Sequence, residues 1–246
     1  MSEQCARQIV ISVAGRLALL ALLISAAATA ALSQSVYRLA PASPDGIGKF
    51  YMGREISHVM GWQGAAWLER SNRQEEERTD LLLPLLGVQP GMVVADIGAG
   101  TGYFSRRIAP LVGAQGRVYA VDVQPEMVKM LEAVTKQSHF ARIAPILGSN
   151  KEVNLPPDSI DLALMVDVYH ELDYPKEVLA SIVRALKAGG RVVFVEYRAE
   201  DPTVPIKPLH KMSEAQIRRE AAEHALVWER TAGPLPWQHV VIFRKK

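Results

Sequence analysis

Three alternating glycines follow an acidic residue in the segment Val93-Val94-Ala95-Asp96-Ile97-Gly98-Ala99-Gly100-Thr101-Gly102-Tyr103. Glycine has no Cβ, so these positions can adopt positive φ and leave room for a ligand to lie against the main chain. The apolar run before them predicts a buried parallel strand. A helix that begins after them would direct free N–H groups toward the same point. The segment therefore predicts a ligand-binding turn between a strand and a helix.

Two acids indicate what this turn would bind. Asp96 precedes the first glycine by two residues, where a carboxylate would repel a pyrophosphate and suit an ammonium group. Asp122 ends the next predicted strand, where a carboxylate can accept hydrogen bonds from both hydroxyls of a ribose. The glycine spacing also differs from the Gly-x-Gly-x-x-Gly of dinucleotide-binding folds. A ligand with a cationic amino acid end and a ribose fits both acids, although Asp96 could instead cap the glycine turn.

A third segment, Leu186-Lys187-Ala188-Gly189-Gly190-Arg191-Val192-Val193-Phe194-Val195-Glu196, completes an ordered set with the glycine turn and Asp122. With this set the chain resembles the class I S-adenosylmethionine-dependent methyltransferases, over residues 81–244. The resemblance implies S-adenosyl-L-methionine as cofactor and methyl transfer to a small or medium-sized acceptor. The residues that we assign to the cofactor are Asp96, Gly98, Ala99, Gly100, Thr101, Gly102, Asp122, Val123, Ser149, Asn150 and Asp167.

Adenine recognition is the least defined part of this assignment. Many members of the family carry an acid after the third strand that accepts from the adenine amino group. This chain has Gly148-Ser149-Asn150 there instead. Ser149 or Asn150 could accept through its side-chain oxygen, or the three residues could simply form a turn.

The residues after the fourth predicted strand are candidates for chemistry at the methyl group, since the ligand crevice of such a sheet lies beyond the carboxyl ends of its strands. A histidine with an ordinary pKa near ~6.5 can take a proton from oxygen or nitrogen at neutral pH. We therefore predict His170 as the base, Glu171 as the residue that orients it, and Tyr169 as a residue lining the sulfonium. The alternative is that His170 and Glu171 begin the next helix or face solvent.

The acceptor would be bound by residues outside these motifs. We expect residues 51–86 to be helical and to form a lid, with Tyr51 and Trp67 as its walls, although spaced pairs such as Glu69 with Arg73 also fit a solvated helix face. His210, in the proline-rich loop after the fifth strand, is a further candidate for substrate contact or an ordinary loop residue. We assign none of these residues to a metal.

The fold that would bring these residues together is a doubly wound α/β domain. We predict a mostly parallel seven-stranded sheet, a C-terminal antiparallel hairpin and N-terminal helices. The pattern of apolar runs, prolines and glycines predicts strands and helices in alternation. The predicted strands are 92–97, 117–122, 142–147, 160–166, 191–197, 226–230 and 239–244, and the predicted helices are 103–112, 125–137, 175–189 and 213–224.

Composition bounds the remaining possibilities. The 246 residues allow one substantial domain, residues 51–246, after an N-terminal extension. A net charge of +2, without a long basic run, gives no indication of a nucleic-acid partner. The single cysteine, Cys5, precedes the domain, which therefore has no disulfide, no thiolate nucleophile and no cysteine-rich zinc site. The sequence does not define the acceptor or the oligomeric state.

Residues 1–33 carry a targeting pattern. Arg7 and Arg16 precede an apolar stretch from Leu17 to Leu32, which ends near a small-residue cleavage site. The stretch is shorter than the roughly 20 residues that span a bilayer comfortably, so a signal peptide is favoured over an uncleaved membrane anchor or a buried helix. Residues 34–50, rich in proline and glycine, are expected to be a linker.

The targeting pattern predicts an exported or membrane-anchored protein, which conflicts with a methyl donor made and kept inside cells. Two other functions therefore stay open beside methyl transfer. One is binding of S-adenosyl-L-methionine without transfer, which export would favour. The other is NAD-dependent oxidoreduction, which the glycine spacing and the predicted closing hairpin disfavour.

Overall fold

The computed structural model describes residues 35–136, 140–233 and 235–246. The chain divides into two units, residues 1–38 and residues 39–246. The expected signal segment, residues 1–33, lies outside the described residues, and the first described strand is β1 (Tyr37–Leu39). In the described part of the chain, each helix is too short or too polar to cross a bilayer.

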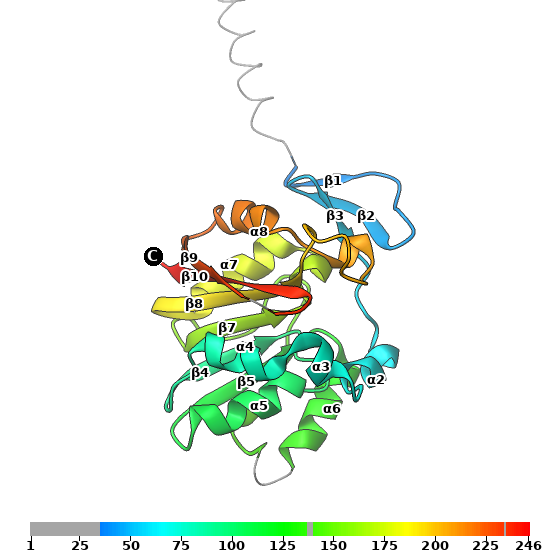
Figure 1. Ribbon diagram of the computed structural model, residues 1–246. Coiled ribbons are helices and arrows are strands. Elements are labelled where there is room, and N and C mark those ends of the chain that lie inside the picture. Colours follow the sequence, from blue (N-terminus) through cyan, green and yellow to red (C-terminus); the bar gives the residue numbers. More distant parts are fainter. Residues whose placement is uncertain (1–34, 137–139, 234) are drawn as a thin grey trace, which may run out of the picture. The chain divides into compact units, whose positions relative to one another are not determined.

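The described residues of the second unit contain a sheet of seven strands in the order β6-β5-β4-β7-β8-β10-β9 (Figure 1). Strands β4 to β8 pair in parallel, and β10 runs antiparallel to both β8 and β9. This arrangement confirms the mostly parallel sheet and its antiparallel C-terminal hairpin. The strands are β4 (Val93–Ile97), β5 (Arg117–Asp122), β6 (Ile143–Leu147), β7 (Ile160–Val166), β8 (Leu186–Tyr197), β9 (Leu226–Ala232) and β10 (Gln238–Lys245).

Helices cover both faces of this sheet, as a doubly wound fold requires. Val193 and Val195 of β8 pack with α4, α5 and α6 on one face, whereas Val192 and Phe194 pack with α7 and α8 on the other. Such alternation explains why β8 is apolar along most of its length. The helices are α4 (Thr79–Leu86), α5 (Tyr103–Val112), α6 (Pro125–Thr135), α7 (Pro175–Ala185) and α8 (Glu214–Ala221) (Figure 1).

The C-terminal end of α7 differs from the sequence prediction. We expected the helix to run to the glycine pair at 189–190, but it ends at Ala185. Leu186 is already extended and pairs with Ile160 of β7, so β8 begins before the glycines. Pairing with the neighbouring strand therefore ended the helix before the residues that usually terminate one.

Residues 46–57 form a β-hairpin, so the expected linker over 34–50 and the helix expected from Tyr51 are both wrong for this segment. Strand β2 (Gly46–Tyr51) pairs antiparallel with β3 (Arg54–Ser57). Met52 and Gly53 connect them, both with positive φ. A two-residue connection of this kind matches the twist of paired strands. Tyr51 therefore lies at a strand end rather than on a lid helix.

The expected N-terminal helices occur only after this hairpin, and they are short. Arg78, whose φ is 48°, interrupts the run between α3 and α4. The elements before α4 are the 3-10 turn η1 (Trp62–Gly64), α2 (Ala65–Leu68) and α3 (Arg73–Glu77). Helices of four and five residues are too short to be stable alone, so contacts with the rest of the domain stabilise them.

Candidate functional site

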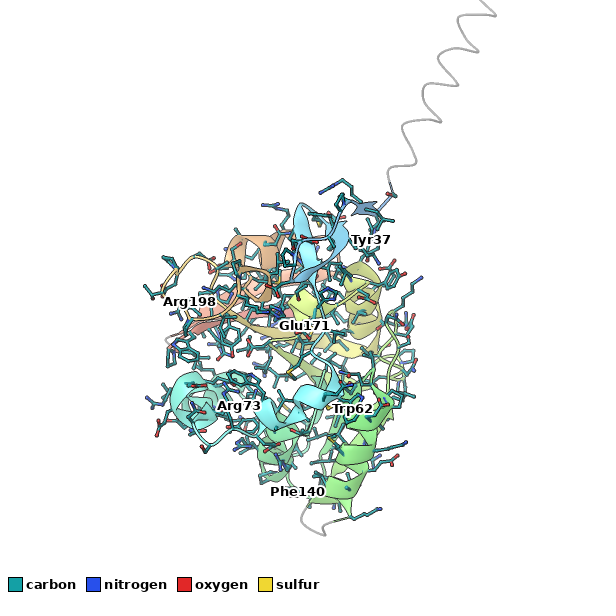
Figure 2. All side chains as sticks on the ribbon, turned by 90° about the vertical axis from the view of Figure 1, so that its right-hand side faces the viewer. Tyr37, Trp62, Arg73, Phe140, Glu171 and Arg198 are labelled. Atoms are coloured by element: carbon teal, nitrogen blue, oxygen red, sulfur yellow. The ribbon has the colours of Figure 1, made fainter. Side chains whose placement is uncertain are left out.

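A cavity of about 630 Å³ opens at the carboxyl ends of β4, β5 and β7. It lies where ligands bind in open α/β sheets, and its volume is in the range of sites for small molecules. Segments far apart in the sequence contribute to its wall, and Glu171 among them lies near the centre of the view in Figure 2. The predicted site residues that line it are Trp67, Gly98, Gly100, Asp122, Val123, Ser149, Asn150, Asp167, His170, Glu171 and His210.

The glycine turn has the backbone that the sequence predicts. Gly98, Gly100 and Gly102 have φ of 68°, 54° and 84°. A Cβ at Gly98 would come within 2.5 Å of Val168, and one at Gly100 would come within 2.5 Å of Leu68. The positive φ and the close approach together exclude side chains here.

The other residues of the turn hold it in place without lining the cavity. The Ala99 N–H donates to the carbonyl of Val121 at 3.0 Å, which ties the turn to β5. Gly102 is the N-cap of α5, and the Thr101 hydroxyl donates to Glu69. Ala99, Thr101 and Gly102, all assigned to the cofactor from the sequence, are absent from the cavity wall. Their contribution is to shape the backbone at Gly98 and Gly100.

Asp122 lies at the end of β5 on the cavity wall, as expected for a ribose acceptor. Its Oδ2 accepts from the Gly100 N–H and its Oδ1 from the Gln124 N–H, both at 2.9 Å. Burial raises the pKa of this carboxyl, while the backbone donors oppose the rise. Each carboxylate oxygen has a second lone pair available for a hydroxyl. Val123, next in the chain, is 46% exposed and also lines the cavity.

Asp96 lies behind the turn rather than on the cavity wall. Its side chain is buried, and its Oδ2 accepts from the Ser105 hydroxyl at 2.6 Å. Burial raises the pKa of Asp96 to about 6, although the hydrogen bond from Ser105 favours the ionised form. The carboxylate thus links β4 to α5 and has a structural role, although its partner is Ser105 of α5 rather than the glycine turn that, as the alternative, we expected it to cap.

Asp167 offers the acceptor that Asp96 does not. It lines the cavity with a φ of 53°, a conformation that non-glycine residues rarely adopt. Its Oδ2 accepts from the Gln238 amide at 2.7 Å, and its buried Oδ1 has no hydrogen-bond partner among the described residues. Burial, with the nearby charges of Glu77 and Glu196, raises the pKa of Asp167 well above its usual range. A cationic hydrogen-bond donor in the cavity would satisfy this atom.

The turn after β6 lines the cavity through Gly148, Ser149 and Asn150. The Ser149 hydroxyl accepts from the backbone N–H of Glu152 at 3.1 Å, and the Ser149 N–H donates to the Glu152 carbonyl at 2.8 Å. Ser149 thus has the turn role that was one of its two alternatives. Asn150 remains the residue of this turn predicted to meet adenine.

His170 is oriented by Glu196, not by Glu171 as we expected. Its Nδ1 lies 2.6 Å from Oε2 of Glu196, which is fully buried in β8, and the other oxygen of Glu196 accepts from the Tyr169 N–H at 2.8 Å. Burial lowers the pKa of His170, but the charge of Glu196 and its hydrogen bond outweigh burial and raise it overall. One indication of this contact was present in the sequence, because Glu196 is a lone carboxylate inside an apolar strand.

Glu171 and His210 complete a cluster with His170 on the cavity wall. Glu171 Oε1 lies 3.7 Å from His170 Nε2 and 3.5 Å from His210 Nδ1. Its Oε2 accepts from the Met60 N–H at 3.2 Å. The loop after β8 therefore brings His210 to the two residues that follow β7, a proximity that the sequence did not predict.

Tyr169 and Tyr51 do not line the cavity, which contradicts their predicted roles. Tyr169 is fully buried, and its ring contacts Phe194 edge to face at 4.9 Å between centroids. It lies in the 3-10 turn η3 (Tyr169–Glu171), where neighbouring side chains point in different directions, so Tyr169 faces the core while His170 faces the cavity. Tyr51 is only 2% exposed, at the end of β2.

The segment from Met60 to Glu69 covers the glycine turn. Leu68 fills the space over Gly100, and Trp67 lines the cavity with its ring stacked under the Arg70 guanidinium. Glu69 accepts from the Thr101 hydroxyl and from Arg106 of α5. Contacts with the turn therefore replace the predicted solvated pair of Glu69 with Arg73. The sequence did not single out Met60, Leu68 or Glu69 for these contacts.

Comparison with known proteins agrees with this geometry. Residues 95–194 match the family model of a methyltransferase domain. An uncharacterised methyltransferase of Mycobacterium tuberculosis is 34% identical over 142 residues, 58% of this chain and 53% of that protein. A ubiquinone/menaquinone biosynthesis C-methyltransferase of Ectopseudomonas mendocina is 27% identical over 116 residues, 47% of this chain and 45% of that protein. The chain thus spans about half the length of the curated relatives that it matches.

Solved structures extend the likeness over more of the chain. A S-adenosylmethionine-dependent methyltransferase from Aquifex aeolicus superimposes with a TM-score of 0.72 and 22% identity, and covers 76% of this chain and 100% of its own. At that identity the likeness concerns the fold. Residues 95–194 therefore match a methyltransferase domain, and the chain has the fold of a S-adenosylmethionine-dependent methyltransferase.

Proposed function

We propose that this protein transfers a methyl group from S-adenosyl-L-methionine to a small or medium-sized acceptor. The observation that carries the proposal is that one cavity holds both the glycine turn with Asp122 and the cluster of His170, Glu171 and His210. The first set suits a donor with a ribose, and the second suits the polar atom of an acceptor. A single cavity lets the two substrates meet.

The donor fits the groups on the cavity wall. The bare backbone at Gly98 and Gly100 admits close approach, and Asp122 would accept from the ribose hydroxyls. The free Oδ1 of Asp167 would accept from the ammonium group, which supplies the partner that this buried atom lacks. Asn150 would meet the adenine. These assignments leave the His170 cluster for the acceptor.

S-adenosyl-L-methionine supplies, when bound, a methyl carbon whose bond to sulfur breaks with the electron pair going to sulfur, so that S-adenosylhomocysteine remains. The protein contributes mainly position, which alone can account for roughly 7–11 kcal/mol of the barrier. His170 Nε2 faces the cavity, where it would take the proton from an acceptor oxygen or nitrogen as the new bond forms. A general base of this kind contributes about 10²–10⁴-fold.

Two other functions make different predictions. A protein that binds the donor without transfer would bind S-adenosylhomocysteine and methylate nothing. An NAD-dependent oxidoreductase would bind NAD, for which the glycine spacing and the antiparallel closing strand β10 give no support. Calorimetry of the full chain with S-adenosylhomocysteine and with NAD separates the second alternative.

A transfer assay distinguishes methyl transfer from binding of the donor without transfer. The full chain is incubated with S-adenosylmethionine labelled in the methyl group and with acceptor pools sorted into phenols, amines and activated carbons, beside the Gly100→Val variant as the donor-site control. We expect label in a small-molecule product with the native chain and none with the variant. Tight S-adenosylhomocysteine binding without product from any pool would favour the binding protein. An absence of S-adenosylhomocysteine binding would contradict the proposal altogether.

We further propose that residues 1–33 direct export or membrane anchoring, on the sequence pattern of Arg7, Arg16 and the apolar stretch after them. Fusion of this segment to a reporter that is active only outside the cytoplasm tests the proposal. Mass spectrometry of the mature N-terminus then distinguishes cleavage near Ser33 from an intact anchor.

A further inference from the structure

The cluster of His170, Glu171 and His210 has the composition and spacing of a metal site. One ligand atom from each residue lies within 4.8 Å of the others, and all three residues line the cavity. We propose that these three side chains bind a divalent transition-metal ion of the zinc type, with an open coordination position facing the cavity.

The distances within the cluster fit ligands better than they fit hydrogen-bond partners. Glu171 Oε1 is 3.7 Å from His170 Nε2 and 3.5 Å from His210 Nδ1. N–H···O hydrogen bonds are about 2.7–3.2 Å long, so these three polar atoms face one another without bonding. Tetrahedral coordination with metal–ligand bonds of about 2.0–2.2 Å separates two ligand atoms by roughly 3.3–3.6 Å. The space between the three atoms therefore matches an ion.

The residues behind the cluster orient it as supporting residues orient metal ligands. His170 donates from Nδ1 to the buried carboxylate of Glu196 at 2.6 Å, which directs Nε2 to the cavity. A carboxylate behind a ligating histidine is a frequent feature of zinc sites, since it fixes the tautomer and raises the basicity of the ring. Glu171 is held through Oε2 by the Met60 N–H, so Oε1 is left to face both histidines.

The chemistry of the ligand set selects the ion. Two imidazole nitrogens and one carboxylate suit zinc, iron and other transition metals, whereas magnesium and calcium prefer oxygen ligands throughout. Three protein ligands leave an open position, the arrangement of zinc sites that bind substrate. Glu171 and Glu196 also place carboxylates beside the two imidazole rings, which favours a cation.

From the sequence, none of these three residues was assigned to a metal. His210 lies far from His170 and Glu171 in the sequence, and only the loop after β8 brings the three together. The consequence for catalysis rests on the proposed methyl transfer: the open position would hold the acceptor's oxygen or nitrogen and lower its pKa. His170 would then position the ion, because its Nε2 is no longer available as a base.

Metal binding is tested on the full chain without reference to activity. The protein, in a Cys5→Ser background that removes its only thiol, is treated with EDTA, dialysed and titrated with Zn²⁺ by calorimetry and with Co²⁺ by visible absorption. We expect one Zn²⁺ per chain and a Co²⁺ spectrum of nitrogen and oxygen ligands. An absence of a one-to-one Zn²⁺ site, or one-to-one binding of Mg²⁺ in its place, would overturn the proposal.

Variants assign the site to its residues. His210→Ala, Glu171→Gln and His170→Ala should each weaken Zn²⁺ binding at least tenfold, and Glu196→Gln about 10–100-fold through the orientation of His170. His224→Ala, a histidine on another part of the described chain, should leave it unchanged. Because His170 is buried and its loss can impair folding, the partly exposed His210 carries the test. Native Zn²⁺ affinity in His210→Ala would overturn the proposal.

The same samples distinguish this inference from the proposed function. Calorimetry with S-adenosylhomocysteine reports the donor site, whose residues lie outside the cluster. Loss of Zn²⁺ binding with native S-adenosylhomocysteine binding in His210→Ala supports a separate metal site. Donor binding without any Zn²⁺ site in the native chain overturns the metal site alone, whereas failure of donor binding would overturn methyl transfer.

Discussion

The Nδ1 atom of His170 and the Oε2 atom of Glu196 lie 2.6 Å apart, between a 3-10 turn after β7 and the interior of strand β8. Both residues are buried, so their charges interact through a medium of low polarity. The contact fixes the ring of His170 so that its second nitrogen faces the cavity. It also links the protonation of His170 to a carboxylate that does not line the site.

Removal of the Glu196 charge should lower the pKa of His170. In the native chain this pKa is raised above its ordinary value of about 6.5, because Glu196 outweighs burial. In Glu196→Gln the two largest influences that raise this pKa are gone and only the charge of Glu171 still raises it, so burial, which favours the neutral ring, prevails. Titration of His170 by NMR in EDTA-treated protein measures both values, with Glu223→Gln, an exposed glutamate, as the control. A native titration in Glu196→Gln would contradict the assigned cause.

The sign of this shift determines the pH dependence of stability and rate. Because the folded pKa is raised, the stabilisation from charged His170 is fully present below about pH 6.5 and is lost as pH rises through the raised value. If neutral Nε2 accepts the proton, the metal-free rate should fall as pH drops through the same value. In Glu196→Gln the acid limb should move to lower pH. A limb that stays in place would mean that another group is titrating.

Asp122→Ala should weaken binding of S-adenosylhomocysteine at least tenfold. A carboxylate that accepts from two ribose hydroxyls makes charge-assisted bonds worth about 1.5–3 kcal/mol each at most. Calorimetry of the full chain measures the loss, and a thermal melt verifies folding, since Asp122 also accepts from Gly100 and Gln124. Asp158→Ala, at an exposed carboxylate, is the control. Native affinity in a folded Asp122→Ala protein would remove Asp122 from the site.

Gly100→Val should abolish donor binding, because the side chain would be strained at a φ of 54° and would collide with Leu68. Gly189→Val separates these causes. Gly189 also has positive φ, at 72°, but a Cβ there meets nothing within 4 Å. Both variants should lose stability, and only Gly100→Val should lose S-adenosylhomocysteine binding. Equal affinities in the two folded proteins would show that the glycine turn does not hold the ligand.

Patterns that are local in sequence predicted most of the fold. Strand β5 and helix α5 were predicted with their observed bounds, because the apolar runs and the glycine turn dominate those segments. The hairpin at residues 46–57 was missed, since Gly46 and Gly48 gave the signals of a loop and pairing between β2 and β3 overrode them. Local propensity thus failed where contact with another strand decided the conformation.

The site was predicted where it depends on strand ends and missed where it depends on contacts between distant segments. Asp122 ends one parallel strand and His170 follows another, so topology alone places them at the same edge of the sheet. The partner of His170, in contrast, is a carboxylate on a different strand. Glu196 stands out in an apolar strand, but the sequence does not indicate which side chain it contacts. The choice of Tyr169 failed for a related reason, because side-chain direction in a 3-10 turn follows from packing against Phe194.

Glu69→Ala should loosen the segment that covers the donor. Glu69 accepts from Thr101 and Arg106, and these contacts hold Leu68 over Gly100. We expect a several-fold rise in the dissociation rate of S-adenosylhomocysteine, measured by stopped-flow fluorescence of the nearby Trp67. Glu75→Ala, at an exposed position on α3, should have no effect. Unchanged dissociation in Glu69→Ala would mean that the segment is not a lid.

Asp96→Asn should raise the free energy of unfolding relative to that of the native chain, and the increase should be larger at neutral pH than at acid pH. Burial raises the pKa of Asp96 to about 6 from an ordinary value of 3.8, so the folded state binds a proton that the unfolded state has released between these values. The free energy of unfolding of the native chain therefore falls as pH rises through this window. The fall is about 2–3 kcal/mol, because one pKa unit corresponds to 1.36 kcal/mol. Asparagine has no such titration, and its side-chain oxygen can still accept from Ser105.

Urea unfolding of both chains at pH 4.5 and 7.5 gives the difference between their free energies of unfolding, which should shift toward the variant by that amount at the higher pH. Because Asp96 lies behind the turn, S-adenosylhomocysteine affinity should stay within a few-fold of native. A difference that does not change with pH would show that Asp96 stays ionised in the folded protein across this window, and a loss of affinity beyond tenfold would return it to the donor site.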